Sequence, residues 1–451
     1  MLRLTEPKEF LSDLYDFAVQ AANPSRFMSQ HLPEPVKGRT FVVGAGKAAA
    51  TMAKAFEAAW MAAGHGALEG LVVAPEGVKE VKEHCGRIEL LRAAHPVPNK
   101  ASLDAARRIL GIAETLGSDD QMIALLSGGG SALLSLPPPE ISFETKRIIH
   151  QQLLSSGATI SEMNCVRKQF SLIKGGRLAQ AAFPAKTVSL ILSDIPGDLP
   201  HCVASGPTIA DESNEIDALR IVERYQLELP EEAINWLKVP QSKTPSPFDA
   251  ELSAARHTIV GSAQCSLEAA AKHARSKGLA AHILSDCIQG EAREAGKVHG
   301  GIVRQMINYN QPLPVPSILL SGGETTVTVT GDGRGGRNAE FALGFAIEIA
   351  GLKDVHGLVA DTDGIDGMGS NAGVFCSGST VSQLRSKKID PYRALANNDA
   401  LTPFEAIGAL HVTGPTGTNV NDFRAIAVGF ETDLPAYRDS EKLAQSKLDI
   451  E

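Results

Sequence analysis

Five glycine-rich segments are the parts of this chain best suited to chemistry, because each follows an apolar run and two contain a cation. Lys47 ends the turn at 44–47, and Arg337 lies in the segment 331–338. Glycine lets the backbone approach a ligand closely, and a helix that begins just after such a turn directs N–H groups and partial positive charge at an anion. The other three segments are 127–131, 321–324 and 414–419. Together they predict a site for phosphate or carboxylate groups.

The turn at 44–47 allows two interpretations. Gly44 and Gly46 begin a Gly-x-Gly-x-x-Ala sequence between an expected strand and an expected helix, which is typical of dinucleotide binding. The acidic residue of that motif, about 20 positions further on, is not evident. Lys47 also suits a transferring phosphoryl group better than a neutral ribose. A tight turn with an exposed lysine is the purely structural alternative.

The Ser-Gly-Gly-Gly-Ser turn at 127–131 can surround an anion with backbone N–H groups and two hydroxyls. Its order differs from the Gly-x-Ser-x-Gly of serine hydrolases, which disfavours that class. The residues predicted to bind the nucleotide or its phosphates are Gly44, Gly46, Ser127, Gly128, Gly129, Gly130 and Ser131.

Carboxylates follow two expected buried strands, with Asp194 and Asp198 after 187–192 and Asp363 after 357–360. In a phosphoryl-transfer site such groups hold Mg²⁺ or accept the proton of the attacking hydroxyl. We predict Asp194 and Asp198 as metal ligands, and either Asp194 or Asp363 as the base. The segment 361–367 lacks the final glutamate of a calcium loop. The basic stretch at 163–177 is either a solvated helix face or part of the site.

The elements expected around these residues alternate between strands and helices. This alternation implies a largely parallel sheet with helices on both faces. The glycine turns then gather at the carboxyl ends of strands, where ligands bind in such folds. The expected strands are 39–43, 68–74, 121–126 and 187–192, and the expected helices are 8–31, 48–63, 100–116, 142–156 and 161–182.

The second half of the chain shows a different sequence pattern. Residues 212–256 look irregular, a β-α-β-α unit covers 258–308, and glycine-bent β runs from 317 favour a mixed sheet. We therefore predict an α/β protein with a Rossmann-like N-terminal domain, whose largely parallel sheet has helices on both faces, and a C-terminal α/β domain with a mixed sheet. The predicted divisions are 1–240 for the first domain, 241–315 for a connecting segment of unsettled membership, and 316–451 for the second domain.

Composition narrows the class of protein. A chain of 451 residues with 43% hydrophobic and 21% charged residues is typical of a soluble protein with two or three domains. The net charge of −9, without a basic stripe, disfavours nucleic-acid binding. No apolar run approaches the roughly 18 residues of a membrane span. The six cysteines form no Cys-x-x-Cys pair, so we expect no zinc knuckle or disulfide scaffold, and a cytoplasmic location.

Taken in order, these segments resemble one family, the glycerate kinases that make 2-phosphoglycerate, which are also labelled hydroxypyruvate reductases. The matching segments cover most of the chain and are 43–49, 95–98, 126–132, 164–168, 174–179, 193–198, 204–208, 321–325, 335–340, 362–367 and 413–422.

The resemblance implies a site in the cleft between the two domains, with Mg-ATP as phosphoryl donor and D-glycerate as acceptor. It also implies roles for individual residues. Phosphoryl transfer needs positioning and charge neutralisation, and one well-placed cation contributes about 3–4 kcal/mol to the transition state. By resemblance, Lys47 and Arg337 are the essential cations, Asp194 and Asp363 are catalytic, and the cleft is completed by Glu324, Asn338, Asn419, Arg167 and Lys174.

Three departures from the family pattern leave another short sugar acid open as the acceptor. They are Gln169, Ala339 and Asn371, the last at a position where the family has a carboxylate. Two other functions are also compatible with the sequence. The Gly44-x-Gly46 fingerprint is compatible with an NAD(P)H-dependent hydroxypyruvate reductase, and the glycine turns alone are compatible with a non-catalytic anion-binding protein. The sequence does not fix the oligomeric state, so a homo-oligomer stays open.

Overall fold

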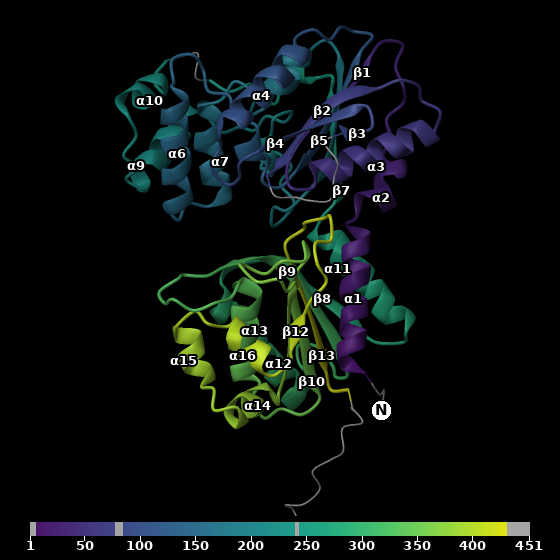
Figure 1. The fold of residues 1–451 in the computed structure, drawn as a ribbon, viewed down its shortest axis with the longest axis vertical. Helices are drawn as coiled ribbons and strands as arrows, with labels where there is room; N and C mark the ends of the chain where they lie inside the picture. Colours follow the sequence, from purple (N-terminus) through teal and green to yellow (C-terminus); the bar gives the residue numbers. More distant parts are fainter. Residues whose placement is uncertain (1–5, 77–83, 240–242, 431–451) are drawn as a thin grey trace, which may run out of the picture.

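Two α/β domains, drawn one above the other in Figure 1, make up the computed structural model, which describes residues 6–76, 84–239 and 243–430. The sheet of the first domain has the order β3-β4-β2-β1-β5-β6-β7. Its strands are parallel except for the short β3, which pairs antiparallel with β4. Their bounds are β1 Thr40–Ala45, β2 Glu69–Pro75, β3 His84–Cys85, β4 Ile88–Ala93, β5 Gln121–Ser127, β6 Lys186–Leu192 and β7 Ala255–Gly261.

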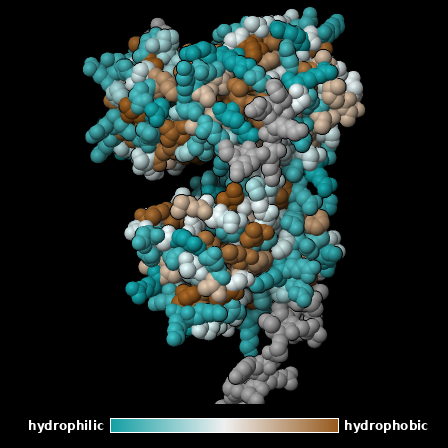
Figure 2. Space-filling view, in the orientation of Figure 1, coloured by the Kyte–Doolittle hydropathy of each residue, from teal (hydrophilic) through white to brown (hydrophobic). Residues whose placement is uncertain are grey.

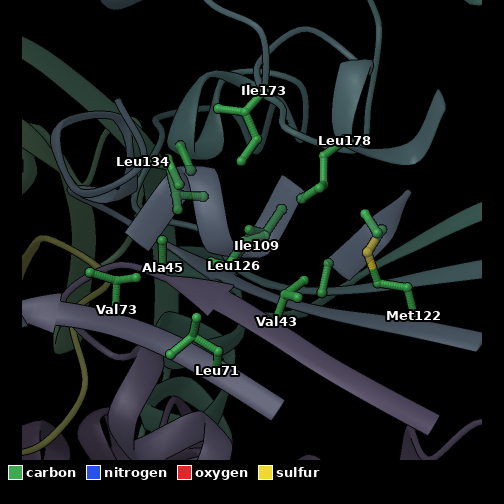
Figure 3. Close-up of a cluster of buried hydrophobic side chains, with 14 of the residues drawn as sticks. Val43, Ala45, Leu71, Val73, Ile109, Met122, Leu126, Leu134, Ile173 and Leu178 are labelled. Atoms are coloured by element: carbon green, nitrogen blue, oxygen red, sulfur yellow. The ribbon is translucent and has the colours of Figure 1, made fainter. Parts of the chain in front are cut away.

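Helices cover both faces of this sheet because its central strands are apolar on both sides. Val43 and Val73 face a core completed by Ile109 and Leu178 (Figure 3), while Val42 points to the opposite core. Such continuous apolar strands are typical of a parallel sheet buried between helical layers. The surrounding helices are α2 Pro24–Phe27, α3 Ala49–Ala62, α4 Lys100–Ala113, α5 Gly130–Leu133 and α8 Arg177–Ala182, with 3₁₀ turns at Met28–Gln30, Val203–Ser205 and Ala250–Leu252.

Four helices form a separate bundle beside the first sheet, at the upper left of Figure 1. They are α6 Phe143–Ser155, α7 Ile160–Gln169, α9 Glu215–Arg224 and α10 Glu231–Trp236. Thr159 and Glu162 form a capping box that fixes the start of α7. The bundle has its own core around Phe170. Two of its helices, α9 and α10, lie within 212–256, where the sequence suggested irregular structure. Each is short and buries only a few side chains, so it was not recognised from the sequence.

The second sheet has the order β12-β11-β10-β13-β9-β8. Only β8 and β9 run parallel, so the sheet is mixed. Its strands are β8 Ala281–Glu291, β9 Ser317–Thr326, β10 Val355–Asp361, β11 Gly373–Ser377, β12 Leu410–His411 and β13 Asp422–Val428. One face packs against α1 Pro7–Ala21 and α11 Ala263–Ser276. The other packs against α12 Ala292–Tyr309, α13 Arg337–Glu348, α14 Thr380–Ser386, α15 Pro391–Ala396 and α16 Leu401–Ala406. The predicted α/β fold, with one largely parallel and one mixed sheet, is confirmed.

The two domains do not divide the chain at a single point. The N-terminal helix α1 packs on the second sheet, with Tyr15 donating a hydrogen bond to the main-chain oxygen of Asp361 at 2.8 Å. Within 241–315, β7 joins the first sheet whereas α11, β8 and α12 belong to the second. The first segment of the chain therefore helps to fix the end of β10, which carries residues of the site described below.

Strand order places two glycine turns side by side. β1 lies between β2 and β5, and successive strands extend away from it in both directions. The carboxyl ends of β1 and β5 are adjacent, with Ala45 opposite Leu126. Ligands in such sheets bind where the strand order reverses. A loop from the second domain, yellow in Figure 1, rises toward the first domain, and its Thr418 donates a hydrogen bond to the main-chain oxygen of Ala22 at 2.7 Å.

Candidate active site

The turns after β1 and β5 are locked together by hydrogen bonds. The Lys47 N–H donates to the main-chain oxygen of Gly128 at 2.8 Å, and the Ala48 N–H donates to Oγ of Ser127 at 3.1 Å. A Cβ at Gly46 would overlap Oγ of Ser127, so this contact requires glycine. Two amides at the start of α3 are therefore used within the chain. This arrangement disfavours the dinucleotide interpretation, in which they would cradle a pyrophosphate.

A similar arrangement is found at the start of α13. The carboxylate of Asp366 accepts the Asn338 N–H at 3.0 Å and the Ala339 N–H at 2.9 Å. Burial raises the pKa of Asp366 to about 6. The Asn338 side chain is fully buried and donates to Asp422 at 3.1 Å. Asn338, predicted as a cleft residue, thus holds the site together rather than facing a ligand.

A cavity of about 410 Å³ opens between the domains, within the deep cleft visible in Figure 2. Its lining includes the predicted Gly128, Gly129 and Ser131. Gly129 has a φ of +80°, and a Cβ there would lie 2.9 Å from Nε2 of His95. We refer to this as the first cavity. Four other predicted phosphate-binding residues are not among the described residues that line this cavity: Gly44, Gly46, Ser127 and Gly130. Their close contacts lie within the chain and pack the turns together.

Asp194 lines the first cavity and lies two residues after the end of β6. A Cβ at Gly128 would overlap Oδ2 of Asp194, so the carboxylate packs directly on this turn. Its Oδ1 is buried and has no hydrogen-bond partner among the described residues. Burial and the nearby Glu324 raise the pKa of Asp194 to about 6. The main-chain oxygen of Asp194 accepts a hydrogen bond from the Asn421 side chain, which ties it to the second domain.

Arg167, on α7, is the buried cation that lines the first cavity. Its exposed fraction is 4%, and its Nε has no partner in the part of the chain that the structure describes. Burial lowers the pKa of Arg167 to about 10. Burial, Lys47 and Arg167 together lower the pKa of His95 to about 4. Burial and the charge of Arg167 also lower the pKa of His150, to about 2. Arg167 is therefore a desolvated positive charge beside two neutral histidines.

The other cations of the basic stretch have internal partners. Lys168 pairs with Asp211, and Lys174 donates to the main-chain oxygen of Leu134. Burial and the charge of Arg167 lower the pKa of Lys174 to about 7. Lys174, which we predicted for the cleft, is not among the described residues that line it. The structure therefore separates Arg167 from its neighbours in sequence.

Arg337 is held by three carboxylates of the second domain. Its guanidinium donates to Asp422 at 2.6 Å, to Asp361 at 2.7 Å and to Glu324 at 3.1 Å. Burial would lower the pKa of Arg337, but these carboxylates raise it above its ordinary value. Asp422 also pairs with the fully buried Arg424 at 2.5 Å. Burial would raise the pKa of Asp422, but Arg337 and Arg424 outweigh it and hold the pKa below its ordinary value.

A second cavity, of about 700 Å³, extends from this network. It is lined by Arg337, Asp361 and Asp363 from the second domain and by Lys47 from the first. Lys47 lines both cavities, and Glu324 lines the first cavity while bonding to Arg337. The predicted catalytic residues Lys47, Arg337, Asp194 and Asp363 therefore meet around two neighbouring cavities, although they come from distant segments.

Two other predicted residues, Asn419 and Asp198, are not among the described residues that line either cavity. Oδ1 of Asn419 accepts the Asn421 N–H at 3.0 Å, so Asn419 shapes the loop that reaches Asp194. Asp198 lies in a turn with a φ of +52°. Among residues 6–76, 84–239 and 243–430, no three His, Cys, Asp or Glu side chains are grouped to hold a metal ion. The pair Asp194 and Asp198 as metal ligands stays a prediction.

The sequence analysis assigned no individual role to Asp422, Arg424, His95 or His150. One signal was available for two of them. Asp422 and Arg424 are two residues apart at the start of an otherwise apolar strand, so they share one face of β13. Charges on a buried strand need partners. The partner, Arg337, lies 85 residues earlier in the chain, and only the fold brings it near.

The fold and the cleft define a two-domain α/β protein with a charged site between its domains, and comparisons with known proteins agree. A family model described as a domain of unknown function (DUF4147) matches residues 10–238, and the MOFRL family model matches 317–422. The D-glycerate 2-kinase of Thermotoga maritima is 39% identical, over 92% of this chain and 97% of the relative. A crystal structure of glycerate kinase from Thermotoga maritima has a TM-score of 0.83 at 37% identity, covering 93% of this chain and 99% of that one.

A protein of Agrobacterium vitis whose provisional name is hydroxypyruvate reductase is 46% identical, over 94% of both chains. The chain belongs to the glycerate 2-kinase family. No helix in the described ranges has the length and apolar character needed to cross a bilayer.

Proposed function

We propose that this protein transfers the γ-phosphoryl group of ATP to the 2-hydroxyl of D-glycerate, giving 2-phospho-D-glycerate and ADP. The observation that carries the proposal is the position of Lys47, whose side chain lines both cavities of the cleft. One ammonium group there can neutralise charge between a donor in one cavity and an acceptor in the other. Phosphoryl transfer depends mainly on such positioning and charge neutralisation. Membership of the glycerate 2-kinase family supports the same reaction.

In this proposal Asp194 is the base that accepts the proton of the 2-hydroxyl. A general base works best when its pKa is near the operating pH, and the pKa of Asp194 is raised to about 6. Its buried Oδ1 lacks a partner among the described residues, so an incoming hydroxyl can supply one. Asp363, the other candidate, already uses Oδ1 to accept the Ile365 N–H at 2.9 Å. These differences favour Asp194.

Arg167 is proposed to bind the carboxylate of the acceptor. A buried guanidinium without a carboxylate partner in the described chain is matched well by a planar carboxylate. We assign the turn with Gly128, Gly129 and Ser131 to the transferring phosphate, because it lies beside Lys47 in the same cavity. Arg337 has five N–H donors and uses three of them on carboxylates. The remaining donors are available to the donor phosphates in the second cavity.

Because Asp194 is assigned here as the base, we propose Asp363 and Glu324 as the carboxylates for Mg²⁺ in place of the predicted pair Asp194 and Asp198. Asp363 and Glu324 line the cleft and supply the hard oxygen atoms that this ion prefers. Mg²⁺ is commonly held by one or two carboxylates together with substrate phosphates. When bound with the nucleotide, the ion would neutralise negative charge on the phosphates.

The test is ADP release from Mg-ATP, measured with D-glycerate, with other short sugar acids, and beside NAD(P)H consumption with hydroxypyruvate. We expect glycerate-dependent ADP release without NAD(P)H consumption, and a product with its phosphate on carbon 2 by ³¹P NMR. Lys47→Ala should lower kcat/KM about 100- to 1,000-fold, as for loss of one electrostatic contact in a transition state. Lys54→Ala, an exposed lysine on α3, is the control. NAD(P)H consumption without ADP release would refute the proposal.

A further inference from the structure

Charged and apolar side chains both line the second cavity. Lys47 and Arg337 supply positive charge to the lining, which also includes the carboxylates of Glu340, Asp361, Asp363 and Asp366. Val329, Ile365 and Met368 line the same cavity, with exposed fractions of 73%, 43% and 90%. We call these three side chains the apolar wall. Single exposed apolar residues are common on protein surfaces, but here three residues from two separate segments converge on one cavity, and hydrophobic residues border the cleft in Figure 2.

Hydrogen bonds fix the two segments that carry the apolar wall. Oδ1 of Asn398 accepts the Thr330 N–H at 2.7 Å and the Gly331 N–H at 3.0 Å, immediately after Val329. The Ile365 N–H donates to Oδ1 of Asp363 at 2.9 Å. The exposure of the wall is therefore a feature of an anchored loop structure. Leaving large apolar groups in contact with water is unfavourable, so a ligand that covers them gains affinity.

We propose that the apolar wall binds the base and ribose of the donor nucleotide, with the phosphates extending toward Arg337 and Lys47. This inference rests on the proposed function, because it assumes a nucleoside triphosphate as donor. A nucleotide has a flat, weakly polar ring at one end and a polyanion at the other, so one ligand can contact both the apolar wall and the cations of this cavity. Ligand sites are commonly apolar with a few well-placed polar groups.

The alternative placement of the nucleotide in the first cavity fits less well. That cavity also has apolar lining, including Leu154 and Met163, but it is smaller, about 410 Å³ against about 700 Å³. It contains Arg167 and Asp194, which suit a small hydroxy acid. With the nucleoside on the apolar wall and the acid in the first cavity, Lys47 lies at the boundary where transfer occurs.

The experiment compares wild type with the double variant Ile365→Ala, Met368→Ala, and with Met61→Ala as a control. Met61 is a half-exposed methionine on α3, and is not among the described residues that line either cavity. Binding of ADP and of inorganic tripolyphosphate is measured by calorimetry, and KM is measured for Mg-ATP and for D-glycerate. We expect the double variant to bind ADP at least tenfold more weakly, with tripolyphosphate affinity and the KM for D-glycerate within twofold of wild type.

Each other outcome would overturn the inference. Unchanged ADP affinity would mean that the wall does not contact the nucleoside. Equal weakening of ADP and tripolyphosphate would indicate a disturbed phosphate site. A raised KM for D-glycerate alone would assign the wall to the acceptor, and a lower kcat with unchanged affinities would assign it to closure of the cleft. Failure of the proposed function is a separate result, because wild type would then release no ADP with D-glycerate while ADP binding could still be measured.

Discussion

Replacing Asp194 by asparagine should make the protein more stable and nearly inactive. The pKa of Asp194 is raised from its ordinary value of 3.8 to about 6 by burial and by Glu324. Because the folded-state pKa lies above the unfolded one, the ionised carboxylate destabilises the folded protein. The penalty is absent below the unfolded pKa, grows as the pH rises through 6, and is then constant at about 3 kcal/mol.

Asparagine removes this ionisation without changing the size of the side chain. We expect Asp194→Asn to raise the free energy of unfolding by up to about 3 kcal/mol at pH 8 and by about half of that at pH 5. Urea unfolding followed by circular dichroism at both pH values measures this difference. Asp104→Asn, at an exposed position on α4, is the control and should change stability by less than about 0.5 kcal/mol. If Asp194→Asn does not raise the free energy of unfolding, or raises it equally at both pH values, the pKa of Asp194 is not raised in the folded protein.

Activity gives the second half of this prediction. If Asp194 is the base, kcat/KM of wild type falls about tenfold per pH unit below pH 6, where the carboxyl is protonated. Loss of a general base costs about 100- to 10,000-fold, so Asp194→Asn should lose at least 100-fold in a coupled assay of ADP release. A wild-type profile that stays flat from pH 5 to pH 8 would show that Asp194 is not the base.

Three further substitutions test other parts of the site. Arg167→Gln should raise the KM for D-glycerate at least tenfold and leave the KM for Mg-ATP within twofold; a selective effect on Mg-ATP would place the acceptor elsewhere. Gly128→Ala should lower kcat at least about 100-fold, because the new Cβ overlaps the carboxylate of Asp194, the proposed base. Gly111→Ala, with no atom within 4 Å of the new Cβ, should be fully active. Arg337→Ala should lower the free energy of unfolding by about 3–5 kcal/mol by leaving buried carboxylates unpaired, against less than about 1 kcal/mol for Arg334→Ala in an exposed ion pair; equal effects would contradict the buried network.

The sequence predicted where the glycine turns lie better than which contacts their individual groups make. Glycine turns after apolar runs correctly marked the ends of β1 and β5, because tight turns and buried strands both leave local signals. The same local signals did not show which groups form hydrogen bonds within the chain. The amides of Lys47 and Ala48, expected to face an anion, bond to the neighbouring turn. Asn338, expected in the cleft, is buried beneath it.

The amino-acid pattern by itself determined the α/β class, the two kinds of sheet and the resemblance to one family. These properties depend on apolar periodicity and on short motifs, which are local in the chain. Tertiary structure alone decided which charges meet. Arg337 finds Asp361 and Asp422 across 24 and 85 residues, and the sequence contains no local signal for such pairs. It also decided that Arg167, rather than Lys168 or Lys174, faces the cavity, because neighbouring residues on a helix point in different directions and only packing shows which direction is open.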